Sequence, residues 1–134
     1  MVVGYTSKSV PEKFGLKPNM SAKIINEPKD YEQIMSGWRF DHRVNNDSSK
    51  LDFVHLFVHK QAELASWLPK LKNQLKPAGM IWVSWLKKGS SIPTDVTENY
   101  IRDFALEIGL VDIKVCAVSD IWSGLKLVIP ISQR

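Results

Sequence analysis

The chain has 134 residues, of which 44% are hydrophobic and 24% charged, so it is long enough to bury the core of one domain and too apolar to be disordered. No apolar run is long enough for a membrane span, and the N-terminal segment lacks the apolar block of a signal peptide. Cys116 is the only cysteine, which excludes an internal disulfide and a cysteine-cluster metal site and fits a cytoplasmic protein. The net charge of +4 arises without a basic stripe or a block of like charges, which argues against nucleic-acid binding.

Short elements are expected before residue 50. A short helix is predicted over Val10–Phe14, and the first strand over Ser21–Glu27. A brief helix follows at Tyr31–Ser36. Trp38–Val44 alternates loosely and predicts a second strand. Because the polar loop Asn45–Lys50 is shorter than a crossover between parallel strands, this strand either lies irregularly at a sheet edge or runs antiparallel.

The centre of the chain predicts a strand, a helix and a second strand. Leu51–Val58 is a nearly continuous apolar run, which is typical of a strand buried on both faces. Apolar residues at helical spacing over Leu64–Leu75 predict a helix that Pro69 should kink or restart and that Lys76–Gly79 ends. Met80–Trp85 predicts the next strand. The two strands should therefore be parallel, with a right-handed crossover.

A second helix and a hairpin are expected after residue 94. The pattern at Asp95 and Glu98 resembles a capping box with Asp in the first position, and it precedes an amphipathic helix over Val96–Ile108. Val111–Val118 alternates as a strand, and Gly124–Ile129 predicts the return strand of a hairpin.

Several stretches between residues 51 and 129 carry a family resemblance: HLFV (55–58), WVSWLKK (82–88), TDVTE (94–98), GLVDIKVCAV (109–118) and WSGLKLVI (122–129). As a set they resemble a bacterial family of short domains of unknown function. LDFVHLFV, LKPAGMIWVSW and the closing hairpin are similar to the C-terminal half of class I methyltransferases. The resemblance implies a fold and supplies no activity.

Pattern and resemblance together predict one Rossmann-like α/β domain over residues 1–134, with residues 1–20 as a lead-in. The resemblance implies a truncated methyltransferase-like fold of three layers, in which helices cover both faces of a mostly parallel sheet. The strand at Leu51–Val58 should be central. The strand at Gly124–Ile129 should lie antiparallel between Met80–Trp85 and Val111–Val118.

The motifs for a bound nucleotide or methyl donor are missing. A methyltransferase needs a glycine-rich turn after its first strand, and the turn here is Asn26-Glu27-Pro28-Lys29. The chain also lacks a clear acid at the end of its second strand and contains neither a G-x-G-x-x-G pattern nor a Walker loop. No cofactor is therefore expected, and S-adenosylmethionine in particular should not bind.

The histidines do not predict a metal site. His55 and His59 share a face of the predicted strand, but at about 13 Å they are too far apart to chelate one ion. His55 lies inside an apolar run, where a hydrogen-bonded core histidine is the commoner case. No activated nucleophile is indicated either, so no catalytic residue and no metal ligand is predicted.

A ligand site is predicted at the carboxyl ends of the strands, where ligands bind in open α/β sheets. Three loops should meet there, and they supply His59, Lys60, Trp85, Lys87, Lys88, Asp120 and Trp122. The expected cleft has two aromatic walls and a positive charge. Asp95 and Glu98 should occupy the amides that open the following helix and exclude an anion from them. The alternative is that Asp120 pairs with a lysine and the tryptophans pack shut.

Three functions remain open on the sequence. The favoured one is a binding or interaction domain without catalytic activity, because the fold is sound and no catalytic motif is intact. The alternative is a degenerate or unusual enzyme that acts on a small anionic metabolite at the carboxyl ends of the strands. The third is a homo-oligomer formed through the hairpin edge. The partners that a positive site favours are a small anionic molecule or an acidic protein surface.

Overall fold

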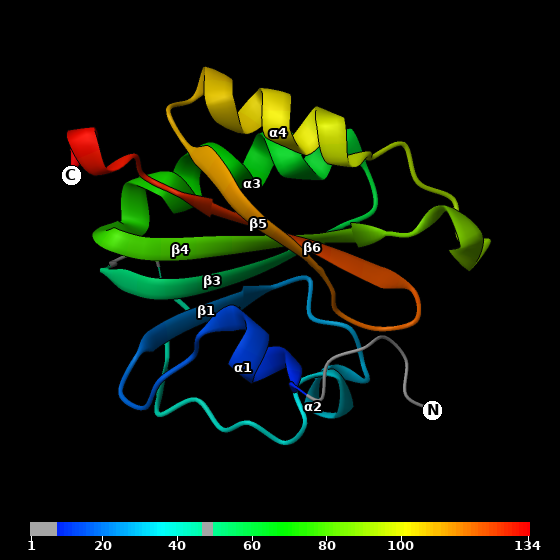
Figure 1. Ribbon diagram of the computed structural model, residues 1–134, viewed down its shortest axis with the longest axis horizontal. Helices are drawn as coiled ribbons and strands as arrows, with labels where there is room; N and C mark the ends of the chain where they lie inside the picture. Colours follow the sequence, from blue (N-terminus) through cyan, green and yellow to red (C-terminus); the bar gives the residue numbers. More distant parts are fainter. Residues whose placement is uncertain (1–7, 47–49) are drawn as a thin grey trace.

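Six strands form one sheet at the centre of the molecule, in the order β2-β1-β3-β4-β6-β5 (Figure 1). The computed structural model describes residues 8–46 and 50–134. The strands are β1 Ser21–Ile25, β2 His42–Arg43, β3 Leu51–Val58, β4 Leu75–Leu86, β5 Val111–Ala117 and β6 Trp122–Val128. Residues 1–7 of the predicted lead-in and 47–49 of the predicted polar loop lie outside the described residues. The sheet confirms the mostly parallel α/β fold.

The last strand lies inside the sheet and not at its edge. Leu125 of β6 faces Val83 of β4 on one side and Val115 of β5 on the other, and both pairings are antiparallel. Leu125 and Leu127 pack into one core, whereas Trp122 and Val128 pack into the other. β6 thus contributes apolar side chains to the cores on both faces of the sheet, which is typical of an internal strand. The predicted insertion of this strand and the central place of β3 are both confirmed.

Helices cover both faces of the sheet and complete three layers (Figure 1). α3 (Gln61–Gln74) and α4 (Glu98–Glu107) pack on one face, where Leu64 and Ile101 are fully buried. α1 (Val10–Phe14) and α2 (Tyr31–Ile34) pack on the other, where Phe14 is buried. Short 3-10 turns follow β4 at Lys88–Ser90 and β6 at Ile131–Gln133. Among the helices of the described residues, none has the length and apolar character that a membrane crossing requires.

The first helix forms where its capping residues predict it. The Ser9 hydroxyl accepts the N–H of Glu12, and the Glu12 carboxylate accepts the N–H of Ser9 at 2.9 Å. Gly15 then ends α1 in a left-handed conformation with φ of 74°. This short helix is held by caps at both ends and places Phe14 on the sheet.

The boundary between α3 and β4 differs from the prediction. α3 runs through Pro69 as a single helix, and β4 begins at Leu75, five residues before the expected start. Leu75 pairs with Leu51 across an irregularity in the ladder. A Cβ placed on Gly79 would lie 2.6 Å from the Leu51 carbonyl oxygen, so only glycine lets the two strands approach this closely.

The predicted second strand shrinks to two residues at the edge of the sheet. Only His42–Arg43 pairs, parallel to Ser21 and Ala22 at the start of β1. Trp38 and Phe40 leave the ladder and pack against the α1–α2 core. β2 ends level with the start of β3, at the same end of the sheet. A short loop is therefore long enough to connect it to Leu51.

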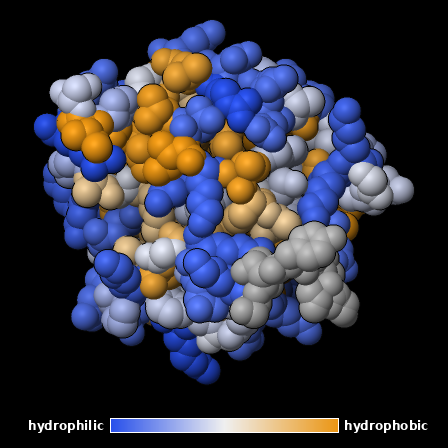
Figure 2. All heavy atoms as spheres, viewed as in Figure 1, coloured by the Kyte–Doolittle hydropathy of each residue, from blue (hydrophilic) through white to orange (hydrophobic). Residues whose placement is uncertain are grey.

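The opposite edge, β5, is irregular and partly apolar. Ile113 and Val115 are 56% and 50% exposed, and Figure 2 shows apolar residues gathered on this face, which β5 and α4 cross. The pairing of β5 shifts between Asp112 and Lys114. Bulges and lysines on an edge strand hinder pairing with another strand. A homo-oligomer through this edge stays a prediction.

Candidate functional site

The three predicted loops do meet at the carboxyl edge of the sheet. His59 and Lys60 follow β3, and Lys87 and Lys88 follow β4. Leu86 pairs with Trp122 at the start of β6, and the Lys87 N–H donates to the Ile121 carbonyl at 2.8 Å. The parallel direction of β3 and β4 and the antiparallel return of β6 bring these residues to one end of the molecule.

The two tryptophans at this edge lie on opposite faces of the sheet. Trp85 is 8% exposed and belongs to the core under α3 and α4. Trp122 is 4% exposed and belongs to the core under α1 and α2, and its ring lies nearly perpendicular to the His59 ring, with 5.4 Å between the ring centroids. The expected cleft with two aromatic walls is therefore wrong, because Leu86 and not Trp85 is the register partner of Trp122.

Asp120 and Lys60 remain at the surface. Both side chains are exposed. In residues 8–46 and 50–134 no ion pair includes Asp120, so the alternative in which it pairs with a lysine is wrong. Their assignment to a ligand site stays a prediction.

Carboxylates occupy the N-terminus of α3. Glu63 accepts the N–H groups of His59 at 2.6 Å and of Lys60 at 3.0 Å. Asp95 accepts the N–H of Gln61 at 2.7 Å, and the Gln61 amide returns a bond to the Asp95 carbonyl at 2.8 Å. These acids already accept the N–H groups of His59, Lys60 and Gln61, which lead into this helix.

The loop before α4 is fastened to the same turn. The Thr94 hydroxyl donates to the His59 carbonyl at 2.7 Å and accepts the N–H of Val96 at 3.1 Å. Together with Asp95, these bonds hold the loop beside the carboxyl ends of β3 and β4. Asp95, the acid predicted to cap α4, therefore accepts an N–H at the start of α3 instead, from Gln61, which lies 34 residues earlier in the chain.

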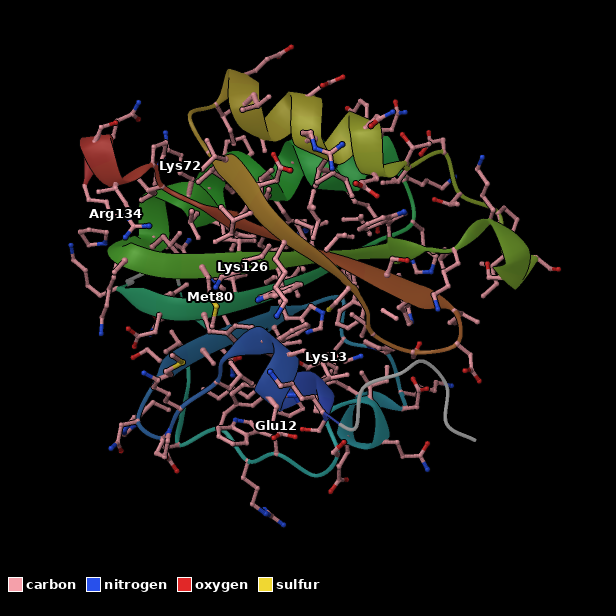
Figure 3. All side chains as sticks on the ribbon, in the orientation of Figure 1. Glu12, Lys13, Lys72, Met80, Lys126 and Arg134 are labelled. Carbon is pink, nitrogen blue, oxygen red and sulfur yellow. The ribbon has the colours of Figure 1, made fainter. Side chains whose placement is uncertain are left out.

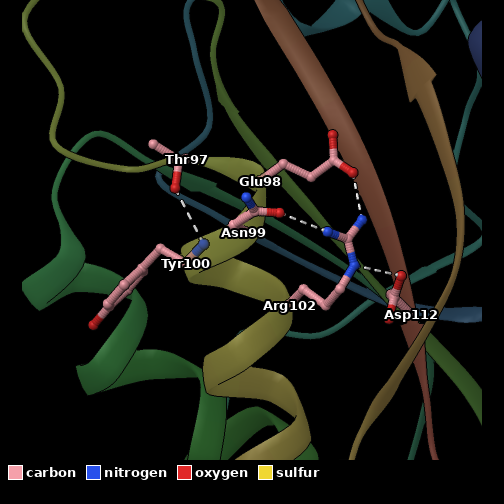
Figure 4. Close-up of polar contacts among 6 residues, drawn as sticks. All are labelled: Thr97, Glu98, Asn99, Tyr100, Arg102 and Asp112. Carbon is pink, nitrogen blue, oxygen red and sulfur yellow. Dashed lines mark hydrogen bonds and ion pairs between the residues drawn. The ribbon is translucent and has the colours of Figure 1, made fainter.

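The N-terminus of α4 is open as a result. Thr97 is the N-cap, and its hydroxyl accepts the N–H of Tyr100 at 3.1 Å (Figure 4). Glu98 turns away and pairs with Arg102, which also donates to Asp112 at 2.9 Å (Figure 4). Among the described residues, no acceptor bonds the N–H groups of Glu98 and Asn99. The expectation that Asp95 and Glu98 occupy these donors is wrong.

A cavity of about 620 Å³ lies beside the start of α4. It is lined by Trp85, Leu86, Lys88, Thr94, Asp95, Val96, Thr97, Glu98 and Asn99. Two of the predicted site residues, Trp85 and Lys88, belong to it. The sequence missed the contribution of Thr94 and Thr97. The TDVTE stretch that carries them pointed to the segment without showing its role.

A buried hydrogen-bond chain crosses the opposite face. His55 Nδ1 lies 2.9 Å from the Tyr31 hydroxyl, and its Nε2 lies 2.8 Å from the Ser84 hydroxyl. Burial lowers the pKa of His55 to about 3 and raises the pKa of Tyr31. A neutral imidazole with two partners is a structural core residue, which confirms the interpretation of His55. The described residues hold no cluster of metal-ligating side chains.

The turn after β1 is bonded to the end of β3 by the side chain of Asn26. Asn26 adopts a left-handed conformation with φ of 58°, and its amide donates to the Phe57 carbonyl at 3.0 Å across the crevice between β1 and β3. The Glu27 carboxylate is paired with Arg43. Because β2 is level with the start of β1, its end does not reach the carboxyl edge, and it brings no acid there.

Comparisons with known proteins identify the fold. No family model and no curated protein matches the chain. Among solved structures, the glycopeptide N-methyltransferase MtfA matches with a TM-score of 0.64 and 8% identity, over 89% of this chain and 87% of that one. A SAM-dependent methyltransferase from Aquifex aeolicus matches with a TM-score of 0.62 and 14% identity, over 90% and 88%. The mitomycin 7-O-methyltransferase MmcR matches with a TM-score of 0.61 and 8% identity, over 83% of this chain and 49% of that one.

These similarities show a shared fold and correct one expectation. The sequence favoured a domain without catalytic activity, and the comparisons overturn that leaning, because the solved structures that share the fold are methyltransferases. The residues after β1 nevertheless do not fit S-adenosylmethionine. Such a fold brings its cofactor to the crevice outside the first strand, where Asn26 here bridges to Phe57. The protein is an α/β domain of methyltransferase-like fold.

Proposed function

We propose that the protein is an unusual enzyme of methyltransferase-like fold that acts on a small anionic molecule in the cavity beside the start of α4. The observation that carries the proposal is that Glu98 and Asn99, whose amides are open, line a cavity together with Lys88. Open amides and the positive end of a helix bind anions. A second positive group at the same cavity strengthens the attraction.

Of the two nearby acids, Asp95 keeps a negative charge that partly opposes this attraction, whereas Glu98 does not. Glu98 is neutralised by its ion pair with Arg102, and one oxygen of Asp95 is bonded to the Gln61 N–H. The volume of about 620 Å³ lies within the range of small-molecule sites. The indole of Trp85 gives the cavity an apolar wall against which the body of a substrate can pack.

The cavity also holds groups that can take part in a reaction. Among the described residues, the second carboxylate oxygen of Asp95 has no hydrogen-bond donor, so it is free to accept a proton from a bound substrate. The hydroxyls of Thr94 and Thr97 can donate to the substrate or accept from it. The proposal includes no step through S-adenosylmethionine. A cytoplasmic location fits this role and the single cysteine of the chain.

The test is a turnover screen. The protein is incubated with a panel of small phosphate esters and carboxylates, with and without S-adenosylmethionine, and the mixtures are analysed by mass spectrometry. We expect conversion of at least one anion without the methyl donor. Lys88→Ala should weaken the apparent affinity for that anion about fivefold, as expected for an exposed charge contact worth about 1 kcal/mol.

Two variants control the screen. Lys29→Ala removes the same charge from an exposed residue that does not line the cavity, and its affinity should equal that of the unchanged protein. Asp95→Asn keeps the shape of the side chain and its bond to Gln61, but it cannot accept the proton, so it should lower turnover more than binding. Absence of conversion across the panel, or equal losses in Lys88→Ala and Lys29→Ala, would rule the proposal out.

A further inference from the structure

A second set of positive charges lies on the α1 side of the β5–β6 hairpin, away from the α4 cavity. Lys126 of β6 is paired in register with Lys114 of β5 on one side and with Trp82 of β4 on the other. Residues directly opposite each other on neighbouring strands point to the same face, and two like charges in that arrangement repel. The sheet therefore places two ammonium groups side by side.

The two lysines resolve this repulsion differently. Lys114 is exposed and donates to the Lys13 carbonyl of α1 at 3.0 Å. Lys126 is half-buried, and among the described residues it has neither a hydrogen bond nor an ion pair. Burial, and then repulsion from Lys114, lower the pKa of Lys126. A half-buried charge without a counter-charge is costly, and an anion beside it would remove that cost.

A cavity of about 340 Å³ opens next to Lys126. Its apolar wall includes Phe14, Met80 and Val128, and its cationic rim comprises Lys17, Lys126 and Arg134. Figure 3 labels three of these residues and shows Met80 beside Lys126, with Arg134 farther out on the C-terminal segment. The volume falls at the small end of the range for small-molecule sites.

Asp52 is the one acidic residue among the described residues that line this cavity, and it is already neutralised. Asp52 accepts the N–H of Ser21 at 2.9 Å and the ammonium of Lys76 at 3.1 Å. It therefore offers no counter-charge to Lys126. Since Asp52 and Met80 lie at the starts of the regular pairing of β3 and β4, this cavity is at the amino edge of the sheet, opposite the α4 cavity.

We propose that this cavity between α1 and the β5–β6 hairpin binds a small carboxylate with an apolar body, its charge on Lys126 and its body against Phe14 and Met80. Charge alone would not select this place, because exposed lysines elsewhere are equally positive. An apolar molecule alone would leave Lys126 without a partner. The combination of a cationic rim and an apolar wall selects a ligand that has both parts.

Calorimetric titrations with four probes test the proposal. Octanoate and 1-naphthoate carry a charge and an aliphatic or aromatic body, acetate carries the charge alone, and 1-octanol carries the body alone. We expect octanoate or 1-naphthoate to bind at least about tenfold more tightly than acetate and 1-octanol. Acetate or 1-octanol that shifts the methyl resonance of Met80 and binds as tightly as either larger carboxylate would overturn the proposal, whereas acetate bound in the α4 cavity leaves that resonance in place.

Three variants locate the binding. Lys126→Gln should weaken the larger carboxylate about tenfold through loss of a charge-assisted contact, and Lys126→Arg should retain it. Lys88→Gln changes the α4 cavity instead and should leave this affinity unchanged, so the failure of one site is distinguishable from the failure of the other. Equal affinity in Lys126→Gln and the unchanged protein would refute the site. If Lys126→Gln does not fold, the methyl resonance of Met80 in the unchanged protein must shift on titration, and an unmoved resonance refutes the site as well.

Discussion

Lowering the pH below 6.5 should destabilise the protein through His55. The imidazole is fully buried between Tyr31 and Ser84, and burial lowers its pKa from 6.5 to about 3. The unfolded chain regains the ordinary value. Between these two values the unfolded chain binds a proton that the native protein excludes. The stabilising contribution of neutral His55 is therefore complete above about pH 6.5 and is lost as the pH falls towards 3.

The size of the effect follows from the difference between the two pKa values. Each pH unit below 6.5 removes about 1.4 kcal/mol of the free energy of unfolding, so about 5 kcal/mol is lost near pH 3. Typical domains have a total stability of about 5–15 kcal/mol. This one group can thus remove a large part of the stability in mild acid, before carboxylate titration is complete.

Urea unfolding followed by tryptophan fluorescence measures this effect, at pH values from about 7.5 down to about 4.5. His55→Gln is the comparison, because its amide can bond both hydroxyls but does not titrate. At neutral pH the variant should be less stable by about 1–3 kcal/mol. The difference should then shrink by about 1.4 kcal/mol for each pH unit below 6.5. Parallel stability profiles for the two proteins would show that His55 accepts a proton equally well in both states and would refute the reasoning.

Three further outcomes are expected. Titration of the protein with S-adenosylmethionine should show no heat of binding at about millimolar concentration, and a micromolar Kd would contradict the argument from the Asn26–Phe57 bond after β1. Gly79→Ala should lower the free energy of unfolding by about 1–3 kcal/mol, because its Cβ would lie 2.6 Å from a carbonyl oxygen, whereas Gly89→Ala meets nothing within 4 Å and serves as the control. Asp95→Ala should lower stability by about 1 kcal/mol through loss of the carboxylate that accepts the Gln61 N–H. Asp120→Ala, which removes an exposed acid, should leave the stability unchanged. Equal stabilities of Asp95→Ala and Asp120→Ala would argue against the cap that Asp95 provides at Gln61.

Local patterns in the sequence predict most of the fold. The apolar run of β3, the helical spacing of α3 and the capping box at Ser9 each describe neighbours in the chain, and the structure forms them nearly as predicted. β4 starts early because Leu75 finds Leu51 across the sheet. β2 nearly disappears because Trp38 is drawn into the core instead of the ladder. Both departures depend on contacts between distant segments.

In the candidate site, too, local patterns were predictable from the sequence and contacts between distant segments were not. The carboxyl ends of parallel strands must meet, so the sequence brings the right loops together. The faces of the two tryptophans depend on the β4–β6 register, which pairs Leu86 with Trp122 and is not visible in the sequence. The capping motif at Asp95 was misread because its carboxylate finds Gln61 in another helix. That long-range bond leaves the amides of α4 open.

A two-dimensional NMR titration with inorganic phosphate and with acetate tests the central claim most directly, because it reports on the anion site without knowledge of the substrate. The backbone amide signals of Glu98 and Asn99 should move progressively and saturate, together with the indole signal of Trp85. The movement should be reduced in Lys88→Ala and retained in Lys29→Ala. Amide signals of Glu98 and Asn99 that stay in place while signals elsewhere move would contradict the proposed site.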